Sequence, residues 1–312
     1  MKALFVDSVH PSCEVLLQGF GFECIKGYLM TQEQVMNEFF KVEVVVIRSR
    51  FKINAEMLRQ ATVLKCIARA GAGMENIDVQ FAEQLGVKCI HAPEGNRDAV
   101  AEHVIGMLLM LFNNLRQADA EVRQGVWLRE ENRGIELKGK KFGIVGYGNM
   151  GEALAQKLIG FGVDILIYDK FKKGFGNQFV RECDMQELYQ ECDIVSLHVP
   201  LSKDTEYLVC NEWIGEFQKP IYLVNTARGK CLRTVDLVSA LKSGKVLGAC
   251  LDVLEYEAVS FEKIAYDDLP ISFVELARLK NVVLSPHIAG WTHESNYKIS
   301  AILAEKIITI FR

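Results

Sequence analysis

The stretch FGIVGYGNMGEALAQKLI, residues 142–159, passes from a short apolar run through the turn Gly146-Tyr147-Gly148-Asn149-Met150-Gly151 into a helical pattern. In a G-x-G-x-x-G turn of this kind the first glycine makes the tight bend, and the second lets a diphosphate approach the backbone. The third glycine packs the helix closely against the strand. The N–H groups at the start of the helix then point toward the phosphates. The stretch therefore predicts a βαβ unit that binds a dinucleotide.

An acidic residue follows at the position that such a site requires. The next apolar run, 163–168, ends in Asp169, which is 18 positions beyond Gly151. A carboxylate there can accept hydrogen bonds from both hydroxyls of the adenosine ribose, and it repels the additional phosphate of NADP. The alternative is a structural turn in which Asp169 caps a helix or is a surface charge. Lys170, Lys172 and Lys173 favour NADP, but the carboxylate outweighs them, and the predicted cofactor is NAD.

Runs rich in Val, Ile and Leu alternate with helical patterns on both sides of this stretch, which is typical of α/β folds with parallel sheets. We expect strands at 2–6, 22–26, 42–47, 64–68 and 87–91 before the turn, and at 142–145, 163–168, 194–197, 221–225, 246–252 and 282–284 from the turn onward. Helices are expected over 97–124 and 291–312.

The predicted fold class is α/β, with two doubly wound parallel-sheet domains. A Rossmann-type NAD domain, residues 97–287, is expected to be inserted in a flavodoxin-like substrate domain, residues 1–96 plus 288–312. The ligand is expected in a cleft where the carboxyl ends of both sheets meet.

Composition narrows the class of protein. The chain has 312 residues, 50% of them hydrophobic and 24% charged, which suits two globular domains. A net charge of -4 gives no general attraction to nucleic acid or to anionic membranes. The longest apolar stretch, 104–112, is too short to span a bilayer, and the N-terminus lacks the apolar region of a signal peptide.

The cysteines point to a reduced compartment. There are nine, scattered along the chain, and none forms a C-x-x-C pair. This pattern favours neither a metal site nor a disulfide framework. We therefore expect a cytoplasmic protein without a metal.

Three of the six histidines, His91, His198 and His287, lie at or just after the end of a predicted strand and so are expected at the cleft. An enzyme that uses a nicotinamide needs a proton donor or acceptor beside the carbon that exchanges hydride, and histidine suits that role near neutral pH. Position alone does not choose among the three, and each of them could instead be a hydrogen-bonded structural histidine.

At this point the chain resembles the D-isomer-specific 2-hydroxyacid dehydrogenases over nearly its whole length. Five motifs in the order of that family carry the resemblance: ARAGAGMENID at 68–78, the glycine turn at 146–151, NTARG at 225–229, GACLDV at 248–253 and SPHIAG at 285–290. Within the family the chain looks most like the members that oxidise 3-phosphoglycerate to 3-phosphohydroxypyruvate at the entry to serine synthesis, and the resemblance implies this NAD-dependent oxidation as the function.

The resemblance implies that Arg228, Glu257 and His287 are the catalytic residues. Arg228 would hold the substrate carboxylate with its planar fork and polarise the neighbouring carbonyl. His287 would take the hydroxyl proton, and Glu257 would hold the imidazole and favour its protonated form. Glu255 competes for that role, but the family places its glutamate five positions after the aspartate that matches Asp252, which selects Glu257.

The resemblance also assigns ligand contacts. Cofactor contacts beyond the three glycines are expected at Asn149, Met150, Asp169, Val199, Pro200, Thr226, Ala227 and Asp252. Asp252 would face the nicotinamide carboxamide, with capping of the loop after its strand as the alternative. Substrate contacts are expected at Arg48, Arg69, Gly71, Ala72 and Asn96, where the two arginines would bind a phosphate group and the others a carboxylate. Arg50 is a further candidate for a phosphate ligand.

Two residues depart from the family pattern. Ala258 stands where most relatives have a proline after the catalytic glutamate, so the loop that holds Glu257 is expected to be less rigid. Trp291 occupies a place that is often small or hydroxylated in the family, and its ring could narrow the substrate pocket.

The resemblance implies a homodimer formed through the NAD-binding domain, and it implies that the C-terminal regulatory domain of some relatives is absent. The alternative functions are a glyoxylate or hydroxypyruvate reductase of the same family, or another D-2-hydroxyacid dehydrogenase. A more remote alternative is a binding protein that senses NAD, as corepressors similar to this family do.

Overall fold

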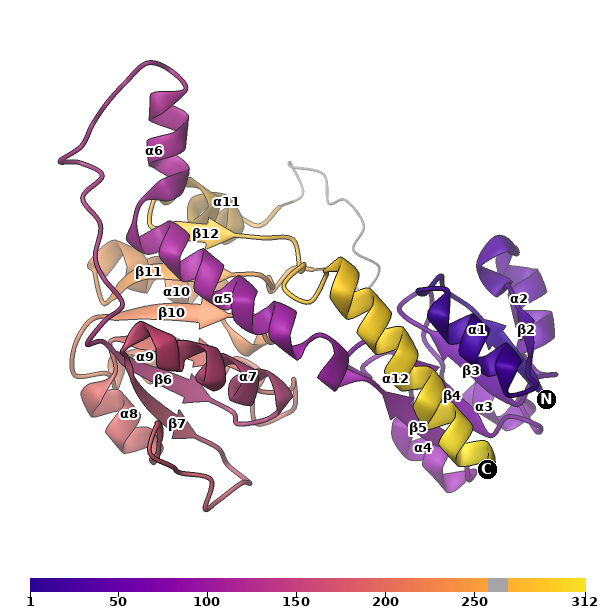
Figure 1. The fold of residues 1–312 in the computed structure, drawn as a ribbon. Helices are drawn as coiled ribbons and strands as arrows, with labels where there is room; N and C mark the ends of the chain where they lie inside the picture. The colour runs from indigo at the N-terminus through magenta and orange to yellow at the C-terminus, as the bar shows by residue number, and fades with distance from the viewer. Residues whose placement is uncertain (258–268) are drawn as a thin grey trace. The chain divides into compact units, whose positions relative to one another are not determined.

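The computed structural model describes residues 1–257 and 269–312 (Figure 1). These residues form two compact units. The first unit is 1–97 with 291–312, and the second unit is 98–257 with 269–290. The sequence predicts domain boundaries after residues 96 and 287. The two units of the structure divide after residues 97 and 290. Each unit contains one parallel sheet.

The sheet of the first unit has the strand order β2-β1-β3-β4-β5. Its strands are β1 (Lys2–Phe5), β2 (Glu23–Ile25), β3 (Val44–Ile47), β4 (Cys66–Arg69) and β5 (Lys88–His91). All four residues of β3 are fully buried, because helices cover both faces of the sheet. The continuous apolar run at this point of the sequence is a consequence of that burial.

Two layers of helices enclose this sheet. On one face lie α1 (Ser12–Gly19) and α12 (His293–Phe311), and on the other lie α2 (Gln32–Phe39), α3 (Ala55–Gln60) and α4 (Val79–Gln84). The short helices η1 (Gly27–Leu29) and η2 (Pro93–Gly95) complete the unit. The helix α12 begins at His293 because the Thr292 hydroxyl accepts the Ser295 N–H, 3.0 Å away.

The sheet of the second unit has the order β12-β11-β10-β9-β6-β7-β8. Its strands are β6 (Lys141–Val145), β7 (Asp164–Tyr168), β8 (Val180–Glu182), β9 (Ile194–Leu197), β10 (Ile221–Asn225), β11 (Val246–Leu251) and β12 (Val282–Leu284). The strand order reverses between β6 and β9. In open parallel sheets the crevice beyond the carboxyl ends at such a reversal is where ligands bind.

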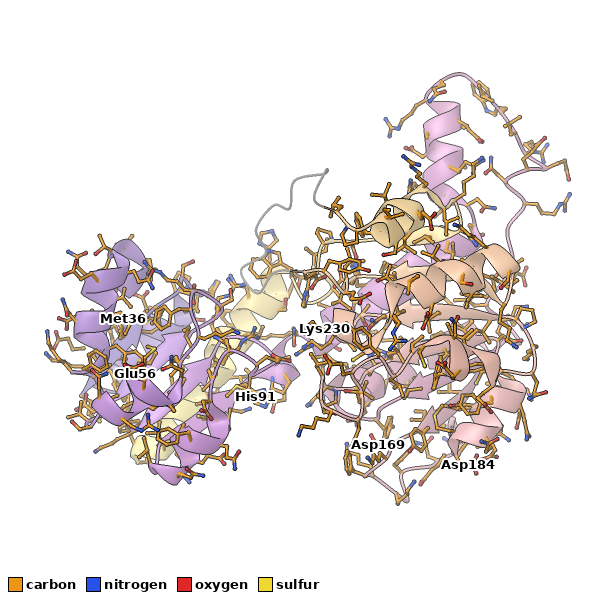
Figure 2. All side chains as sticks on the ribbon, turned by 180° about the vertical axis from the view of Figure 1, so that it is seen from behind. Met36, Glu56, His91, Asp169, Asp184 and Lys230 are labelled. Carbon is orange, nitrogen blue, oxygen red and sulfur yellow. The ribbon has the colours of Figure 1, made fainter. Side chains whose placement is uncertain are left out.

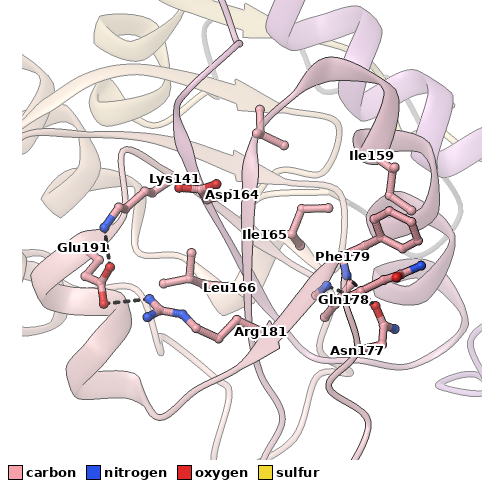
Figure 3. A pocket seen from close by; sticks show the side chains of 12 residues that line it. Lys141, Ile159, Asp164, Ile165, Leu166, Asn177, Gln178, Phe179, Arg181 and Glu191 are labelled. Atoms are coloured by element: carbon pink, nitrogen blue, oxygen red, sulfur yellow. Dashed lines mark hydrogen bonds and ion pairs between the residues drawn. The ribbon is translucent and has the colours of Figure 1, made fainter.

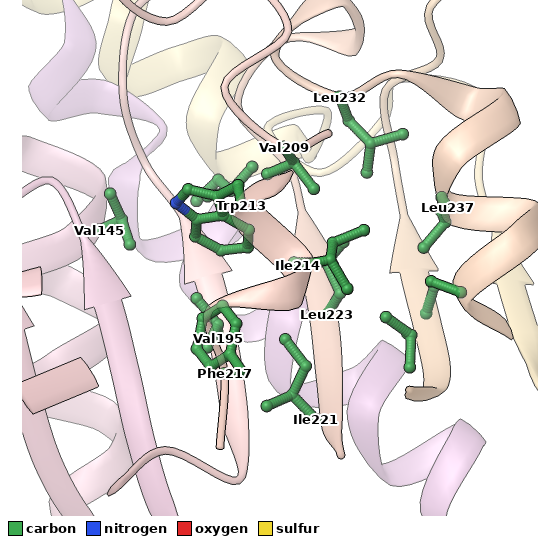
Figure 4. Close-up of a cluster of buried hydrophobic side chains, with 14 of the residues drawn as sticks. Val145, Val195, Val209, Trp213, Ile214, Phe217, Ile221, Leu223, Leu232 and Leu237 are labelled. Carbon is green, nitrogen blue, oxygen red and sulfur yellow. The ribbon is translucent and has the colours of Figure 1, made fainter. Parts of the chain in front are cut away.

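The helices of the second unit are α5 (Arg97–Phe112), α6 (Leu115–Val122), α7 (Asn149–Leu158), α8 (Met185–Glu191), α9 (Asn211–Gly215), α10 (Thr234–Ser243) and α11 (Ile271–Arg278), with the short η3 (Ile159–Phe161) and η4 (Gly229–Cys231). One face of the sheet packs against α5 and α7. The other face packs against a cluster that includes Trp213, Phe217, Ile214 and Leu237 (Figure 4). In the described part of the chain, no helix is long and apolar enough to cross a membrane.

Two predicted elements differ from the structure. The helix expected over 97–124 is two helices, because Asn114 adopts a left-handed backbone (φ 50°) and ends the first of them. Asparagine tolerates this conformation better than most residues do, so the Asn113-Asn114 pair indicates the end of a helix. Hydrophobic periodicity alone does not reveal it. The strand β8 was not predicted, since it has three residues and two of them, Arg181 and Glu182, are charged.

Phe217 is expected to be a main contributor to the core of the second unit. It is 1% exposed, and its ring centroid lies 4.9 Å from that of Trp213 and 5.0 Å from that of Tyr189. Phe217→Ala should lower the free energy of unfolding by about 3–5 kcal/mol, because it leaves a cavity in a packed core. Urea unfolding followed by circular dichroism measures this.

The matched control is Phe171→Ala, whose ring is 82% exposed. We expect it to change the free energy of unfolding by less than about 0.5 kcal/mol. A loss at Phe217 no larger than that at Phe171 would contradict the packing described for this cluster.

Candidate active site

The glycine turn joins β6 to α7, and close packing explains two of its three glycines. A Cβ at Gly146 would lie 2.6 Å from the carbonyl oxygen of His198, and a Cβ at Gly151 would lie 2.1 Å from that of Gly146. Nothing lies within 4 Å of a Cβ built at Gly148. Gly148 precedes α7, and no side chain caps the helix start there. The turn thus presents open space at the N–H groups that can bind a diphosphate.

Asp169 lies at the carboxyl end of β7 and holds this turn (Figure 2). Its Oδ2 accepts the N–H of Tyr147 at 2.7 Å, and its Oδ1 accepts those of Phe171 and Lys172, both at 2.8 Å. Burial acts to raise the pKa of Asp169, but these three hydrogen bonds together keep it below its ordinary value. The carboxylate is therefore ionised at neutral pH and fixed beside the glycine turn.

The neighbouring lysines have other contacts. Lys170 forms an ion pair with Asp204 at 2.7 Å, and Lys172 lies over the ring of Tyr147 at 5.7 Å. Lys173 donates to the carbonyl oxygen of Asp169 at 3.2 Å. These contacts are compatible with the expected preference for NAD over NADP.

The loop after β10 is organised by Asn225, a buried residue. Its Oδ1 accepts the N–H of Ala227 at 3.0 Å, and its Nδ2 donates to the carbonyl oxygen of Arg228 at 3.0 Å. A guanidinium nitrogen of Arg228 donates to the carbonyl oxygen of Ala227 at 2.6 Å. A Cβ at Gly229 would lie 1.9 Å from the carbonyl oxygen of Leu254, so this loop packs directly on the loop after β11.

Thr226, in the same loop, supplies a test of whether a nucleotide cofactor fits. Its hydroxyl oxygen is buried and has no hydrogen-bond partner within the described residues. Buried hydroxyls are normally satisfied, and a ligand is one way to satisfy them. Together with the open space at Gly148 and the ionised Asp169, this hydroxyl fits a bound dinucleotide.

The residues expected to complete the cofactor contacts lie around the same turn. Asn149 and Met150 are the first two residues of α7. Val199 follows β9, and its side chain would lie 3.2 Å from a Cβ at Gly146. The carbonyl oxygen of Pro200 accepts the Thr205 hydroxyl at 2.6 Å.

His287 is paired with a carboxylate. Its Nδ1 lies 2.9 Å from Oε2 of Glu257, whose Oε1 accepts the N–H of Leu254 at 2.6 Å. Glu255 instead accepts the N–H of Thr234, 2.8 Å away at the first residue of α10. The structure thus separates the two competing glutamates, with Glu257 at the imidazole and Glu255 at a helix start. Ala258 lies outside the described residues.

The other two histidines have structural partners. Nε2 of His198 lies 2.8 Å from the Ser196 hydroxyl, and burial lowers the pKa of His198 to about 4. Nδ1 of His91, labelled in Figure 2, lies 2.5 Å from the carbonyl oxygen of Ala72. Of the three histidines at strand ends, His287 alone forms an ion pair within the described residues.

The backbone at His287 is strained. Its φ is 58°, in the left-handed region that non-glycine residues rarely occupy. Asp252, 1% exposed, holds it there. The carbonyl oxygen of Asp252 accepts the N–H of His287 at 2.7 Å, and its carboxylate accepts those of Ile288 and Ala289 at 2.9 and 2.8 Å. Strain of this kind persists only where the surroundings impose it.

Two further residues support Asp252. The Ser285 hydroxyl donates to its Oδ1 at 2.5 Å, and Nε2 of His103, on α5, lies 2.9 Å from that hydroxyl oxygen and 3.5 Å from Oδ1. Burial acts to raise the pKa of Asp252, but the hydrogen bonds from His103, Ser285, Ala289 and Ile288 lower it to about 2. These contacts match the alternative interpretation of Asp252 as a cap for the loop. Its contact with a nicotinamide stays a prediction.

In the first unit, Arg48 and Arg69 lie at neighbouring strand ends. The β3–β4 register pairs Ile47 with Arg69, so Arg48 follows β3 at the edge where β4 ends. Oδ2 of Asp7 accepts the N–H of Arg48 at 2.7 Å. The Arg48 guanidinium lies over the Trp291 ring, with 4.1 Å between Cζ and the ring centroid. Burial lowers the pKa of Arg48, while Asp7 acts to raise it.

The remaining expected substrate residues surround Arg69. A Cβ at Gly71 would lie 1.7 Å from its Nη1, so the guanidinium packs directly over the backbone of Gly71. Ala72 contacts His91, as described above, and Oδ1 of Asn96 is buried without a hydrogen-bond partner among the described residues. Arg50 donates to the carbonyl oxygens of Val6, Gly27 and Met30, and this structural role argues against Arg50 as a phosphate ligand.

Three supporting residues were not singled out from the sequence. Asp7 follows the first predicted strand, so its position at the carboxyl edge could have been inferred. Ser285 is the first residue of the SPHIAG motif at 285–290, but nothing in the sequence distinguishes it from its neighbours as a partner of Asp252. His103 lies within a helix, and only the packing of α5 brings it to Asp252.

A cavity of about 430 Å³ lies elsewhere in the second unit (Figure 3). It is lined by Lys141 and Asp164, the first residues of β6 and β7, and by Arg181 and Glu191. Glu191 forms ion pairs with both Lys141 and Arg181. The cavity therefore lies at the amino ends of the strands, away from Asp169 and the glycine turn.

Comparison with known proteins identifies relatives. Residues 105–289 match the family model of the D-isomer specific 2-hydroxyacid dehydrogenase, NAD binding domain. The chain is 35% identical to a D-3-phosphoglycerate dehydrogenase of Archaeoglobus fulgidus over 99% of its own length, but it spans only 57% of that relative. It is 34% identical to a hydroxypyruvate reductase of Thermotoga maritima, over 89% of this chain and 88% of the relative.

The fold is also similar to solved structures. A D-lactate dehydrogenase from Aquifex aeolicus, complexed with NAD and lactic acid, superposes with a TM-score of 0.83 and 28% identity, covering 100% of this chain and 95% of the other. A Rossmann-type NAD domain is thus present in the second unit, as predicted.

Asp252 should make stability depend on pH. Its pKa in the folded protein, about 2, lies below the ordinary value, so ionised Asp252 stabilises the fold above about pH 4. That contribution is lost as the pH falls through about 2, and it amounts to roughly 2 kcal/mol. Asp252→Asn should therefore lower the free energy of unfolding at pH 7 and flatten its loss between pH 4 and pH 2, as measured by urea unfolding at each pH.

The control is Asp119→Asn, which removes an exposed carboxylate paired with Arg123. Its pH profile should follow that of the unmodified protein, since exposed ion pairs contribute little. Parallel pH profiles for the unmodified protein and Asp252→Asn would contradict the role assigned to the buried carboxylate.

Proposed function

Because the chain belongs to the D-isomer-specific 2-hydroxyacid dehydrogenase family, we propose that it transfers hydride between NAD and a D-2-hydroxy acid, oxidising 3-phosphoglycerate to 3-phosphohydroxypyruvate. The observation that carries the reaction is the His287–Glu257 pair in the loop held by Asp252. The observation that carries the substrate is the pair Arg48 and Arg69 at adjacent strand ends. The product would enter serine biosynthesis.

His287 acts as the general base in the oxidation. Its Nδ1 faces Glu257, which leaves Nε2 to take the proton from the C2 hydroxyl of the substrate. Glu257 stabilises the imidazolium that forms, because an opposite charge close by favours the protonated ring. In the reduction direction His287 returns the proton to the same oxygen.

Arg228 binds the substrate carboxylate. Its guanidinium can form two parallel hydrogen bonds to a carboxylate, a geometry that lysine cannot reproduce. Its backbone is fixed by Asn225 and by the packing of Gly229 on Leu254, so the side chain emerges from a rigid loop. The guanidinium would therefore orient the substrate from a backbone position that the surrounding contacts fix.

The second unit holds the cofactor. NAD, when bound, supplies the acceptor for the hydride that leaves C2. The diphosphate would lie on Gly146, Gly148 and Gly151 with the first residues of α7, Asn149 and Met150. Asp169 would bind the adenosine ribose, and the nicotinamide end would contact Val199, Pro200, Thr226, Ala227 and Asp252.

The first unit supplies the specificity for a phosphorylated acid. Arg48 and Arg69 would bind the phosphate group as charge-assisted donors. The N–H groups of Gly71 and Ala72 would assist at the carboxylate, and the amide Nδ2 of Asn96 would donate to the same group. We propose the first unit as the substrate domain for this reason.

A glyoxylate or hydroxypyruvate reductase is the second candidate function. The chain is 34% identical to the hydroxypyruvate reductase, nearly the same as its 35% identity to the phosphoglycerate dehydrogenase, and this similarity supports the second candidate. The same His287, Glu257 and Arg228 would serve. The two candidates therefore differ only in whether Arg48 and Arg69 bind a phosphate group.

The first experiment follows NADH consumption by the purified protein with phosphohydroxypyruvate, hydroxypyruvate and glyoxylate in parallel, and repeats each with NADPH. We expect kcat/KM to be highest for the phosphorylated acid with NADH. Preference for an unphosphorylated acid would replace the proposal by the second candidate. Tight binding of NADH without turnover of any acid would instead favour a protein that senses NAD.

The control for the chemistry is His287→Ala. Loss of a positioned acid–base group should lower kcat by about 10²- to 10⁴-fold. The binding of NADH, measured by its fluorescence, should be retained, because no predicted cofactor contact is removed. An unchanged kcat would rule out His287 as the base.

We also propose that the protein is a cytoplasmic homodimer formed through the second unit. The helix α6 and the segment after it stand out from the body of this unit in Figure 1 and carry the exposed apolar side chains Leu115, Val122 and Trp127. Exposed apolar patches of this kind are typical of protein interfaces. The nine cysteines carry no disulfide, which suits a reduced compartment.

A Leu115→Glu/Val122→Glu double variant should therefore convert a dimer to a monomer, as measured by light scattering after size-exclusion chromatography. Val15→Glu, on the exposed side of α1 in the first unit, is the control and should leave the mass unchanged. A double variant that keeps twice the mass of one chain would exclude α6 as the interface.

A further inference from the structure

Trp291 is a residue of the first unit that neither the fold nor the proposed chemistry accounts for. Its side chain is 65% exposed, which is unusual for a tryptophan that stabilises a core. Within the described residues, the contact that defines its position is with Arg48, whose Cζ lies over the ring at 4.1 Å from the centroid. Tryptophan binds a cation over its face more strongly than the other aromatic residues do.

Arg48 is held at three points. Oδ2 of Asp7 accepts its N–H at 2.7 Å, and Nδ2 of Asn76 donates to its carbonyl oxygen at 3.2 Å. The Trp291 ring then fixes the far end of the side chain. An unrestrained arginine loses rotamer freedom when it binds an anion, and a guanidinium that is already in place avoids that loss.

The proposed function gives this pair a ligand. Arg48 is one of the two arginines that it assigns to the phosphate group, and Arg48 follows β3 at the edge of the sheet where β4 ends in Arg69. The contact with Trp291 therefore holds a proposed substrate-binding guanidinium in place.

We propose that Trp291 is a specificity-determining residue, which positions Arg48 to bind an anionic group at the end of the substrate distant from C2. The inference rests on the proposed function and adds to it the residue that sets the preference between phosphorylated and unphosphorylated acids. Trp291 does not take part in the proton or hydride steps. Its effect falls on binding of the phosphorylated acid.

The test compares Trp291→Ala and Trp291→Phe with the unmodified protein, using NADH with phosphohydroxypyruvate and with glyoxylate. Trp291→Ala should raise KM for phosphohydroxypyruvate by about 2- to 30-fold, the range for loss of a cation–π contact. Both kcat values and the KM for glyoxylate should stay within about twofold. Trp291→Phe should recover part of the loss, because a smaller ring still offers a face to Arg48.

The matched control is Arg59→Ala, which removes a second arginine–ring pair of the same unit. Cζ of Arg59 lies 4.8 Å from the centroid of the Phe81 ring. Arg59→Ala should leave the KM values for phosphohydroxypyruvate and for glyoxylate unchanged. Thermal unfolding of Trp291→Ala should match that of the unmodified protein, since the exposed ring contributes little to the core.

Calorimetric binding of 3-phosphoglycerate separates this inference from the proposed function. If the unmodified protein turns over no phosphorylated acid, the proposed substrate is wrong. Calorimetry then still tests whether Trp291 positions Arg48 to bind a phosphorylated ligand. Weaker binding to Trp291→Ala, with recovery in Trp291→Phe, supports the inference. Equal losses for both acids, unchanged binding, or a lower KM for phosphohydroxypyruvate in Trp291→Ala would overturn it.

Discussion

The site in the second unit depends on the buried carboxylate of Asp252. Its two oxygens and its carbonyl group together hold residues 287–289, which places His287 in a left-handed backbone conformation. That conformation costs free energy, and three hydrogen bonds to one residue offset it. An ionised carboxylate without partners could not remain buried, so Ser285 and His103 complete its coordination. The position of the imidazole is thus set by residues that need not touch a substrate.

Parallel strands bring the rest of this site together. Gly146 follows β6, Asp169 follows β7, Thr226 follows β10 and Asp252 follows β11. All of these strands point the same way, so residues scattered over more than a hundred positions emerge at one edge of one sheet. Close packing then decides the details. The turn at Gly146 and the loop at Gly229 approach other backbone so closely that no side chain would fit.

The first unit applies the same principle to a different kind of group. Arg48 and Arg69 leave neighbouring strands at the same edge, and each guanidinium is positioned by an adjacent feature of the chain. For Arg69 that feature is the backbone of Gly71, over which its guanidinium packs, and for Arg48 it is the ring of Trp291. Two preorganised cations suit a ligand with concentrated negative charge. A pocket for an acid without a phosphate group would not need these two guanidinium groups.

Local patterns in the sequence determined the two parallel sheets, the glycine turn with Asp169, and the strand ends that carry the polar residues, because continuous apolar runs and glycine spacing are short-range signals. Family resemblance selected Glu257 over Glu255. The sequence did not predict the helix break at Asn114 or the short strand β8, because both depend on packing around a few polar residues. Only the tertiary structure showed that Glu257 contacts His287, that Asp252 holds the histidine loop with His103, and that Trp291 covers Arg48. Each of these contacts joins residues whose separation in the sequence does not follow a helical or strand repeat, so no local pattern predicts them.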